Sequence, residues 1–196
     1  MAQLVLATGF EPFEEHAENP SGDVALGLTA RPPAGVEVVS AVLPVSFGRV
    51  EAAFDAALET LGGRRPDLIL AMGVHKRPGW RVEGWARPHL GMTDRPDTDG
   101  VSAAEGTATR AADAEPLRSS LDVSGLTLSL AELTPEGAGL SWDAGGYVCE
   151  CVYWAALERA RRLRSQALFV HVPPARFTRV ETQVERMRGL LRLALG

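Results

Sequence analysis

The chain has 196 residues, 45% of them hydrophobic and 23% charged, with a formal net charge of −5. This length and composition are typical of one globular domain, so we expect residues 1–196 to form a single domain. The acidic balance argues against binding to nucleic-acid phosphates, so no nucleic-acid partner is expected. No apolar run reaches the roughly 20 residues that span a bilayer, so no membrane partner is expected either.

In the first half of the chain, short apolar runs alternate with helical patterns. The apolar runs end at glycine or other turn residues and predict buried strands at 4–7, 36–43 and 68–72. Asn19 and Pro20 offer the start of one helix. A second helix is predicted over 48–61, where the apolar spacing ends at two glycines.

The second half begins less regularly. A strand is expected within 79–86, and 88–114 is rich in Pro, Gly, Asp and Thr, which predicts a long loop. Apolar and hydroxyl residues alternate over 126–133, which predicts a half-exposed strand, and another short strand is expected at 140–142. A long helix after Gly145 and Gly146, a strand at 167–172 and an amphipathic helix at 177–195 complete the chain.

Strands separated by helices predict the α/β class, with a mostly parallel sheet covered on both faces. Functional residues collect at the carboxyl ends of strands in such sheets. Phe10 and Phe13 project from the loop after the first strand, and His171 lies in the last one. The ends of these strands are therefore the first place to look for a site.

The two cysteines of the chain, Cys149 and Cys151, are too close in sequence for a disulfide between them to stabilise a fold. Their number therefore favours a reducing cytoplasm. Cys149 lies in the first turn of the predicted long helix, where the helix dipole stabilises a thiolate and free N–H groups can receive an oxyanion. With His171 it forms a candidate nucleophile and base pair. Cys151 is expected to be a packing residue. No further cluster of ligands completes a metal site, so no metal is expected.

A third group is needed to orient the His171 imidazole. The sequence offers four carboxylates for this role and does not choose among them: Glu83, Asp97, Asp99 and Asp143. The alternative for His171 itself is a hydrogen-bonded histidine of the core.

Several motifs resemble, in chain order, those of the pyroglutamyl peptidase I family of cysteine exopeptidases. The most specific are TGFEPF at 8–13, AGGYVCE at 144–150 and FVHVP at 169–173. Weaker matches lie at 19–21, 43–48, 82–86 and 95–100. The resemblance covers nearly the whole chain and implies a three-layer α/β/α sandwich with a mostly parallel, twisted sheet.

The resemblance also implies a function, namely removal of the N-terminal 5-oxoproline from peptides by a triad of Cys149, His171 and Glu83. It assigns Phe10 and Phe13 to a sandwich around the flat lactam ring, Asn19 to a polar contact and Tyr147 to the pocket wall. It implies no cofactor, a cytosolic location and a homotetramer.

Some positions depart from the family pattern. Glu14 and Glu15 stand where the family has two glycines, and the loop at 74–78 is one residue shorter. These changes motivate an alternative, a non-peptidase homologue that binds or hydrolyses another small acyl ligand. A phosphorylase of similar architecture would need a phosphate site, and the sequence shows no glycine-rich phosphate-binding loop.

Overall fold

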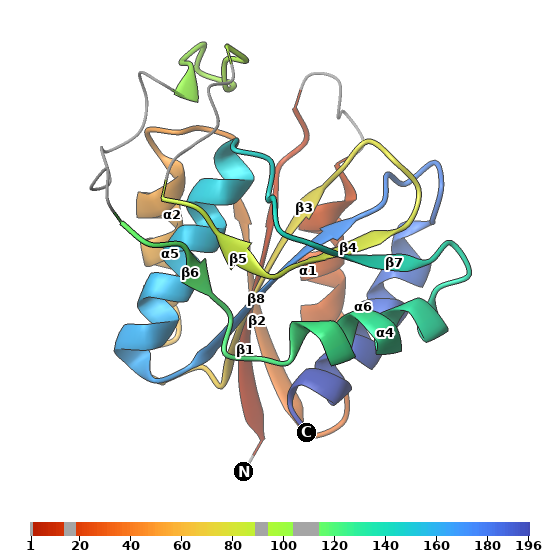
Figure 1. The fold of residues 1–196 in the computed structure, drawn as a ribbon. Helices are drawn as coiled ribbons and strands as arrows, with labels where there is room; N and C mark the ends of the chain where they lie inside the picture. The colour runs from red at the N-terminus through yellow and green to blue at the C-terminus, as the bar shows by residue number, and fades with distance from the viewer. Residues whose placement is uncertain (1, 14–18, 89–93, 104–113) are drawn as a thin grey trace.

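A six-stranded sheet forms the centre of the computed structural model, which describes residues 2–13, 19–88, 94–103 and 114–196 (Figure 1). In spatial order its strands are β2 (Val36–Leu43), β1 (Gln3–Phe10), β3 (Leu68–Val74), β8 (Gln166–Val172), β4 (Trp80–Glu83) and β7 (Ala138–Ser141). The first four are parallel, whereas β4 is antiparallel to β8 and parallel to β7. A separate antiparallel pair joins β5 (Trp85–Ala86) to β6 (Leu117–Arg118).

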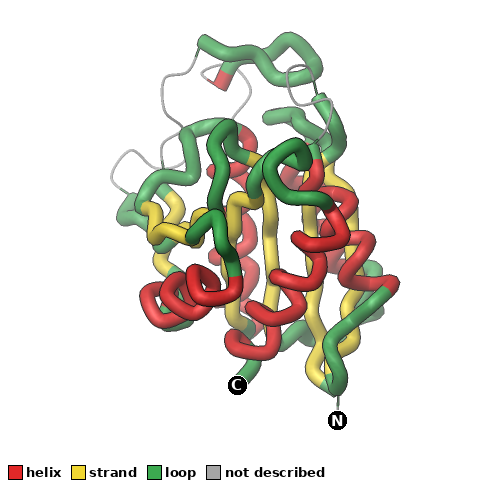
Figure 2. Tube along the Cα trace, turned by 90° about the vertical axis from the view of Figure 1, so that its right-hand side faces the viewer, coloured by secondary structure: helices red, strands yellow, loops and turns green. Residues whose placement is uncertain are grey.

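Helices cover both faces of this sheet. One face packs against α1 (Pro20–Ala30), α4 (Val123–Leu133) and α6 (Val180–Ala194), and the other against α2 (Val50–Glu59) and α5 (Val148–Leu163). Figure 2 is turned so that the first of these faces points to the viewer, with helices in front of the strands. The α/β class, the mostly parallel sheet and the three layers are thus confirmed.

Strand pleating divides the core into two halves. Successive side chains of a strand point to opposite faces, so Leu70 and Met72 of β3 pack under α1 and α6, whereas Ile69 and Ala71 face α5. In the part of the chain that the structure describes, no helix is long and apolar enough to cross a membrane.

The predicted strand at 126–133 is wrong, because this segment is the helix α4. The Asp122 carboxylate accepts a hydrogen bond from the Gly125 N–H at 3.0 Å and caps the helix start. Leu126 and Leu130 are buried at helical spacing, whereas Leu128 is 70% exposed. The alternating leucines and hydroxyl residues imitate a strand, and the cap at Asp122 was the signal that sequence reasoning missed.

The remaining strands and helices lie where the sequence predicts them, with smaller differences. The strand expected within 79–86 is divided into β4 and β5, and β6 was not predicted. Of the expected loop at 88–114, residues 94–97 and 101–102 lack regular structure, 98–99 form a turn and 100 is a bend, whereas 89–93 and 104–113 lie outside the described residues.

The helix α4 makes a testable prediction about two leucines. Replacing buried Leu130 by Ala should lower the free energy of unfolding by about 2–5 kcal/mol, through lost burial and a cavity. Replacing exposed Leu128 by Ala should change it by no more than about 0.5 kcal/mol. Urea unfolding of both variants measures the difference. Equal losses of unfolding free energy in the two variants would contradict the helix, because in a strand the two side chains would share one face.

Candidate active site

The pleat directs four residues of neighbouring strands toward α5. Gly73 of β3 pairs in register with His171 of β8, and His171 pairs with Arg81 of β4. Glu83 follows two residues after Arg81 and therefore points to the same face. Because Cys149 lies in the first turn of α5, the helix brings the thiol to this row of strand residues.

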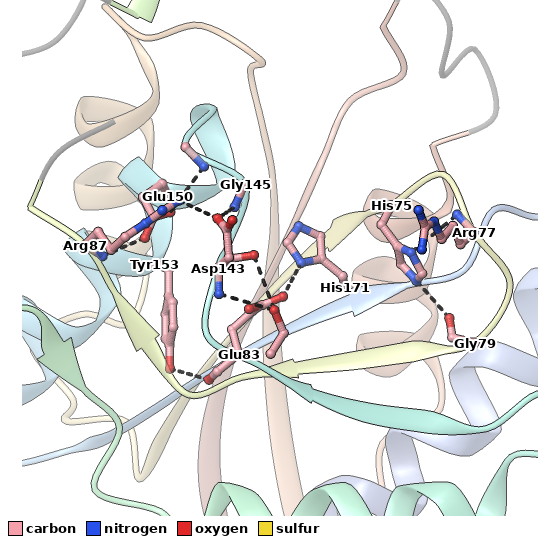
Figure 3. Close-up of polar contacts among 12 residues, drawn as sticks. His75, Arg77, Gly79, Glu83, Arg87, Asp143, Gly145, Glu150, Tyr153 and His171 are labelled. Carbon is pink, nitrogen blue, oxygen red and sulfur yellow. Dashed lines mark hydrogen bonds and ion pairs between the residues drawn. The ribbon is translucent and has the colours of Figure 1, made fainter. Parts of the chain in front are cut away.

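Glu83 and His171 form a buried pair. His171 Nδ1 lies 2.8 Å from Glu83 Oε1, with 0% exposure of the carboxylate side chain and 8% of the imidazole (Figure 3). A carboxylate only accepts, so we assign the proton of this bond to Nδ1, which leaves Nε2 for another partner. The Tyr153 hydroxyl of α5 donates to the Glu83 carbonyl at 2.7 Å and fixes the end of β4 against the helix.

Cys149 approaches His171 across Gly73, where a side chain of any other residue type would occupy the space of the thiol. A Cβ atom added to Gly73 would lie 2.8 Å from Cys149 Sγ and 3.2 Å from His171 Cδ2. The glycine at the end of β3 therefore makes the space in which the thiol sits beside the imidazole. Sequence reasoning placed Gly73 at a strand end but gave it no role, since the role depends on register.

The electrostatics favour a charged His171. Burial lowers its pKa, but the hydrogen bonds to Cys149 and Glu83, together with the negative charges of both groups, outweigh burial and raise the pKa to about 10. At neutral pH His171 is therefore an imidazolium beside the Cys149 sulfur.

A second charge network holds the loop before Cys149. The buried Glu150 carboxylate accepts from the backbone N–H of Arg87 at 2.6 Å and of Gly146 at 3.2 Å. The Arg87 guanidinium pairs with both Glu150 and Asp143, and Asp143 accepts from the Gly145 N–H. Burial raises the pKa of Glu150, against the opposing effect of Arg87. Sequence reasoning missed this network because Arg87 lies 56 residues from Asp143 and 63 residues from Glu150.

The start of α5 leaves two amides available. Within the described part of the chain, the N–H groups of Val148 and Cys149 have no hydrogen-bond partner, whereas the Glu150 N–H donates to the Tyr147 carbonyl. Unpaired N–H groups at a helix start are suited to receive an oxyanion. They lie beside the Cys149 thiol, where a tetrahedral intermediate would form.

A cavity of about 360 Å³ opens above this row of residues. The three aromatic side chains that line it are those the sequence singled out, Phe10, Phe13 and Tyr147. The Phe13 and Tyr147 rings are stacked, with centroids 6.2 Å apart and an angle of 27° between their planes. The Tyr147 hydroxyl donates to the Pro96 carbonyl at 2.9 Å, which fixes its ring.

Asn19 lines the same cavity and also shapes the loop that carries the phenylalanines. Its Oδ1 accepts from the Ser21 backbone N–H at 3.1 Å and so caps α1, and its Nδ2 donates to the Glu11 carbonyl at 3.2 Å. The Ser21 hydroxyl in turn accepts from the Phe10 N–H. The amide thus ties the end of β1 to the start of α1.

Three of the four carboxylates left open by the sequence have partners other than His171. Asp97 is buried and accepts from the Phe47 N–H at 2.7 Å. Asp99 pairs with Arg49, and Asp143 with Arg87. Glu83 is therefore the carboxylate that the fold places on His171.

The two cysteines differ in burial. Cys151 packs in the core at 2% exposure, as predicted, whereas Cys149 is half-buried. Glu14 and Glu15 lie outside the described residues. Over the described ranges, no group of three or more His, Cys, Asp or Glu side chains is arranged to hold a metal ion.

Comparison with known proteins places this site in a family context. The family model described as pyroglutamyl peptidase matches residues 3–183. A pyrrolidone-carboxylate peptidase of Erwinia tasmaniensis is 30% identical over 172 residues, covering 86% of this chain and 77% of the relative. One from Chromobacterium violaceum is 32% identical over 180 residues, with 87% and 78% covered.

Solved structures show the same fold. A mutant pyrrolidone carboxyl peptidase of Pyrococcus furiosus superposes with a TM-score of 0.84 at 24% identity, covering 98% of each chain. Pyroglutamyl peptidase I of Bacillus amyloliquefaciens gives a TM-score of 0.85 at 20% identity, with 100% of this chain and 96% of the other covered.

The close approach at Gly73 predicts a loss of thiol reactivity on substitution. In Gly73→Ala the new methyl group displaces the Cys149 sulfur from His171, so alkylation of Cys149 by iodoacetamide should slow by about 10- to 100-fold. Mass spectrometry of the Cys149 peptide over time measures the rate. Gly139→Ala in β7 is the matched control, since a Cβ there meets no atom within 4 Å. Equal rates in both variants would contradict the assigned role of Gly73.

The Glu83 pair predicts a change in the titration of His171. In Glu83→Gln the carboxylate charge is lost, burial is opposed only by Cys149, and the pKa of His171 should fall from about 10 toward its ordinary value of 6.5. The imidazolium, present in the wild type until the pH rises through about 10, is then lost at lower pH. NMR titration of labelled histidine measures this shift.

Asp99→Asn provides the control for that titration, because Asp99 pairs with Arg49 and Ser46 and not with His171. Its His171 signal should titrate as in the wild type. An unchanged titration in Glu83→Gln would show that Glu83 does not hold the imidazolium.

Proposed function

The chain belongs to the pyroglutamyl peptidase family, and from this premise we propose that it is a cysteine exopeptidase that hydrolyses the N-terminal 5-oxoprolyl residue from peptides. The observation that carries the proposal is the row formed by Cys149, His171 and Glu83 beneath an aromatic cavity. It supplies a nucleophile, a proton donor and a group that orients the donor.

The first half of the reaction forms a thioester. The Cys149 thiolate attacks the carbonyl carbon of the pyroglutamyl residue, and the resulting oxyanion accepts hydrogen bonds from the N–H groups of Val148 and Cys149. The His171 imidazolium gives its Nε2 proton to the leaving amine as the C–N bond breaks. The released peptide carries a free amine, and the acyl group stays on sulfur.

The second half returns the enzyme to its starting state. Neutral His171 accepts a proton from a water molecule as the water oxygen attacks the thioester carbonyl. The C–S bond then breaks, which releases pyroglutamate and restores the thiolate and imidazolium. Glu83 accepts the Nδ1 hydrogen bond throughout, so it holds the ring orientation and stabilises its positive charge.

The aromatic end of the cavity fits the acyl group. Pyroglutamate is a flat, neutral lactam without a free α-amine, so ring faces with a few polar groups are suited to bind it. Phe10, Phe13 and Tyr147 supply the rings, and Asn19 supplies an amide. The stacked arrangement of Phe13 and Tyr147 supports a lactam site at this end.

The family resemblance further supports one domain, a homotetramer and a cytoplasmic location. A reducing compartment suits the chemistry, because the Cys149 thiolate is inactive once oxidised. Light scattering during gel filtration gives the subunit number directly.

The proposed activity predicts release of a fluorescent amine from a neutral pyroglutamyl amide. Cys149→Ala should lower kcat by about 1,000-fold or more, because the nucleophile is lost. Cys151→Ala, which removes the buried packing thiol two positions away, should keep most of the activity. Steady-state rates at several pH values provide the measurement. Absence of turnover in the wild type, or equal rates in wild type and Cys149→Ala, would overturn the proposed function.

A further inference from the structure

We propose that Arg81 makes this site selective for pyroglutamyl peptides whose second residue carries a carboxylate, either on its side chain or as a free C-terminus. The inference rests on the proposed function, since it concerns the leaving-group side of the same cavity.

The strand order gives the site a direction. β1, β3, β8 and β4 are consecutive neighbours, spaced by about 4.8 Å in such sheets. Phe10 marks the aromatic end at β1, Cys149 lies over Gly73 of β3, His171 follows on β8, and Arg81 lies beyond it on β4. The lactam end and Arg81 are therefore on opposite sides of the catalytic pair.

The proposed reaction places the substrate peptide along the same direction, from the aromatic end of the cavity toward β4. The scissile bond joins the pyroglutamyl carbonyl, attacked by Cys149, to the amine that His171 protonates. With the lactam at the aromatic end, the second residue of the peptide extends past His171 toward β4. Arg81 lines the cavity there, together with His75 and Lys76 of the β3–β4 connection.

The positive charge of Arg81 is not neutralised by the acids around it. The Arg81 backbone pairs with β8 and β7, but within the part of the chain that the structure describes, no hydrogen bond or ion pair joins the Arg81 guanidinium to another residue. Glu83, on the same face of β4, binds His171, and Asp143, which also lines the cavity, binds Arg87. An arginine with its donors available at a substrate site matches the two oxygens of a carboxylate.

His75 supports this electrostatic picture. Its Nε2 lies 2.9 Å from the Gly79 carbonyl, and its ring lies edge-on to His171 with centroids 6.3 Å apart (Figure 3). Burial, aided by the charges of His171 and Arg81, lowers the pKa of His75 to about 4. His75 is therefore neutral at physiological pH and forms an uncharged part of the wall, so the fixed positive charge on β4 belongs to Arg81.

The test compares four substrates that differ only after the pyroglutamyl residue. They are pyroglutamyl-alanine amide, pyroglutamyl-glutamate amide, pyroglutamyl-alanine with a free carboxylate, and pyroglutamyl-lysine amide. Peptide-release rates measured by mass spectrometry give kcat/KM for each. We expect at least one carboxylate-bearing substrate to be favoured roughly tenfold over alanine amide, and the lysine amide to be the poorest.

The outcome for the two carboxylate substrates identifies the source. Preference for the glutamate amide assigns the side-chain carboxylate, and preference for the free acid assigns the C-terminus. Arg81→Gln should bring the ratio of carboxylate to neutral substrate close to one, and Arg81→Lys should restore part of it. A ratio measured within one variant is insensitive to partial loss of folded protein.

Arg77→Gln is the matched control. Arg77 is an exposed cation of the same connection but does not line the cavity, so its removal should leave the ratio unchanged. Cleavage of all substrates without a carboxylate preference, or a preference that survives Arg81→Gln, would overturn the inference alone. No cleavage of any substrate would overturn the proposed function and this inference with it.

Discussion

Burial of the Glu83 carboxylate is the constraint on which the site depends. A fully buried carboxylate is costly unless a charged partner and hydrogen bonds compensate it. His171 supplies that partner at 2.8 Å, and the raised pKa of the imidazole, about 10, shows that it carries the matching charge at neutral pH. The Cys149 sulfur then faces this imidazolium. Glu83 therefore fixes both the orientation and the charge of the imidazole that Cys149 meets.

The fold holds this row through elements distant in sequence. Gly73 gives the thiol its room, Tyr153 of α5 fixes the end of β4, and the Glu150 network with Arg87 holds the loop that leads into α5. Their common effect is to set the position of the first turn of α5 relative to the sheet. Pre-organised geometry of this kind is what lets two small groups perform acyl transfer.

Much of this arrangement can be predicted from the sequence. Apolar runs predict β1, β2, β3 and β8, and the position of Cys149 after two glycines predicts a helix start. Reasoning from residues alone left four carboxylates open for His171, because the choice depends on the antiparallel pairing of β4 with β8. The same pairing places Arg81, and the register of β3 with β8 places Gly73. At α4, an alternating pattern favoured a strand where a capped helix forms.

Trapping the acyl group on Cys149 during turnover tests the first step of the proposed mechanism. Acid quenching during steady-state turnover of a pyroglutamyl peptide, followed by mass spectrometry of proteolytic fragments, reports any adduct. We predict a mass increase of one pyroglutamyl group on the fragment with Cys149, located on that residue and not on Cys151. Turnover in the wild type with no adduct at Cys149, together with undiminished turnover in Cys149→Ala, would contradict it.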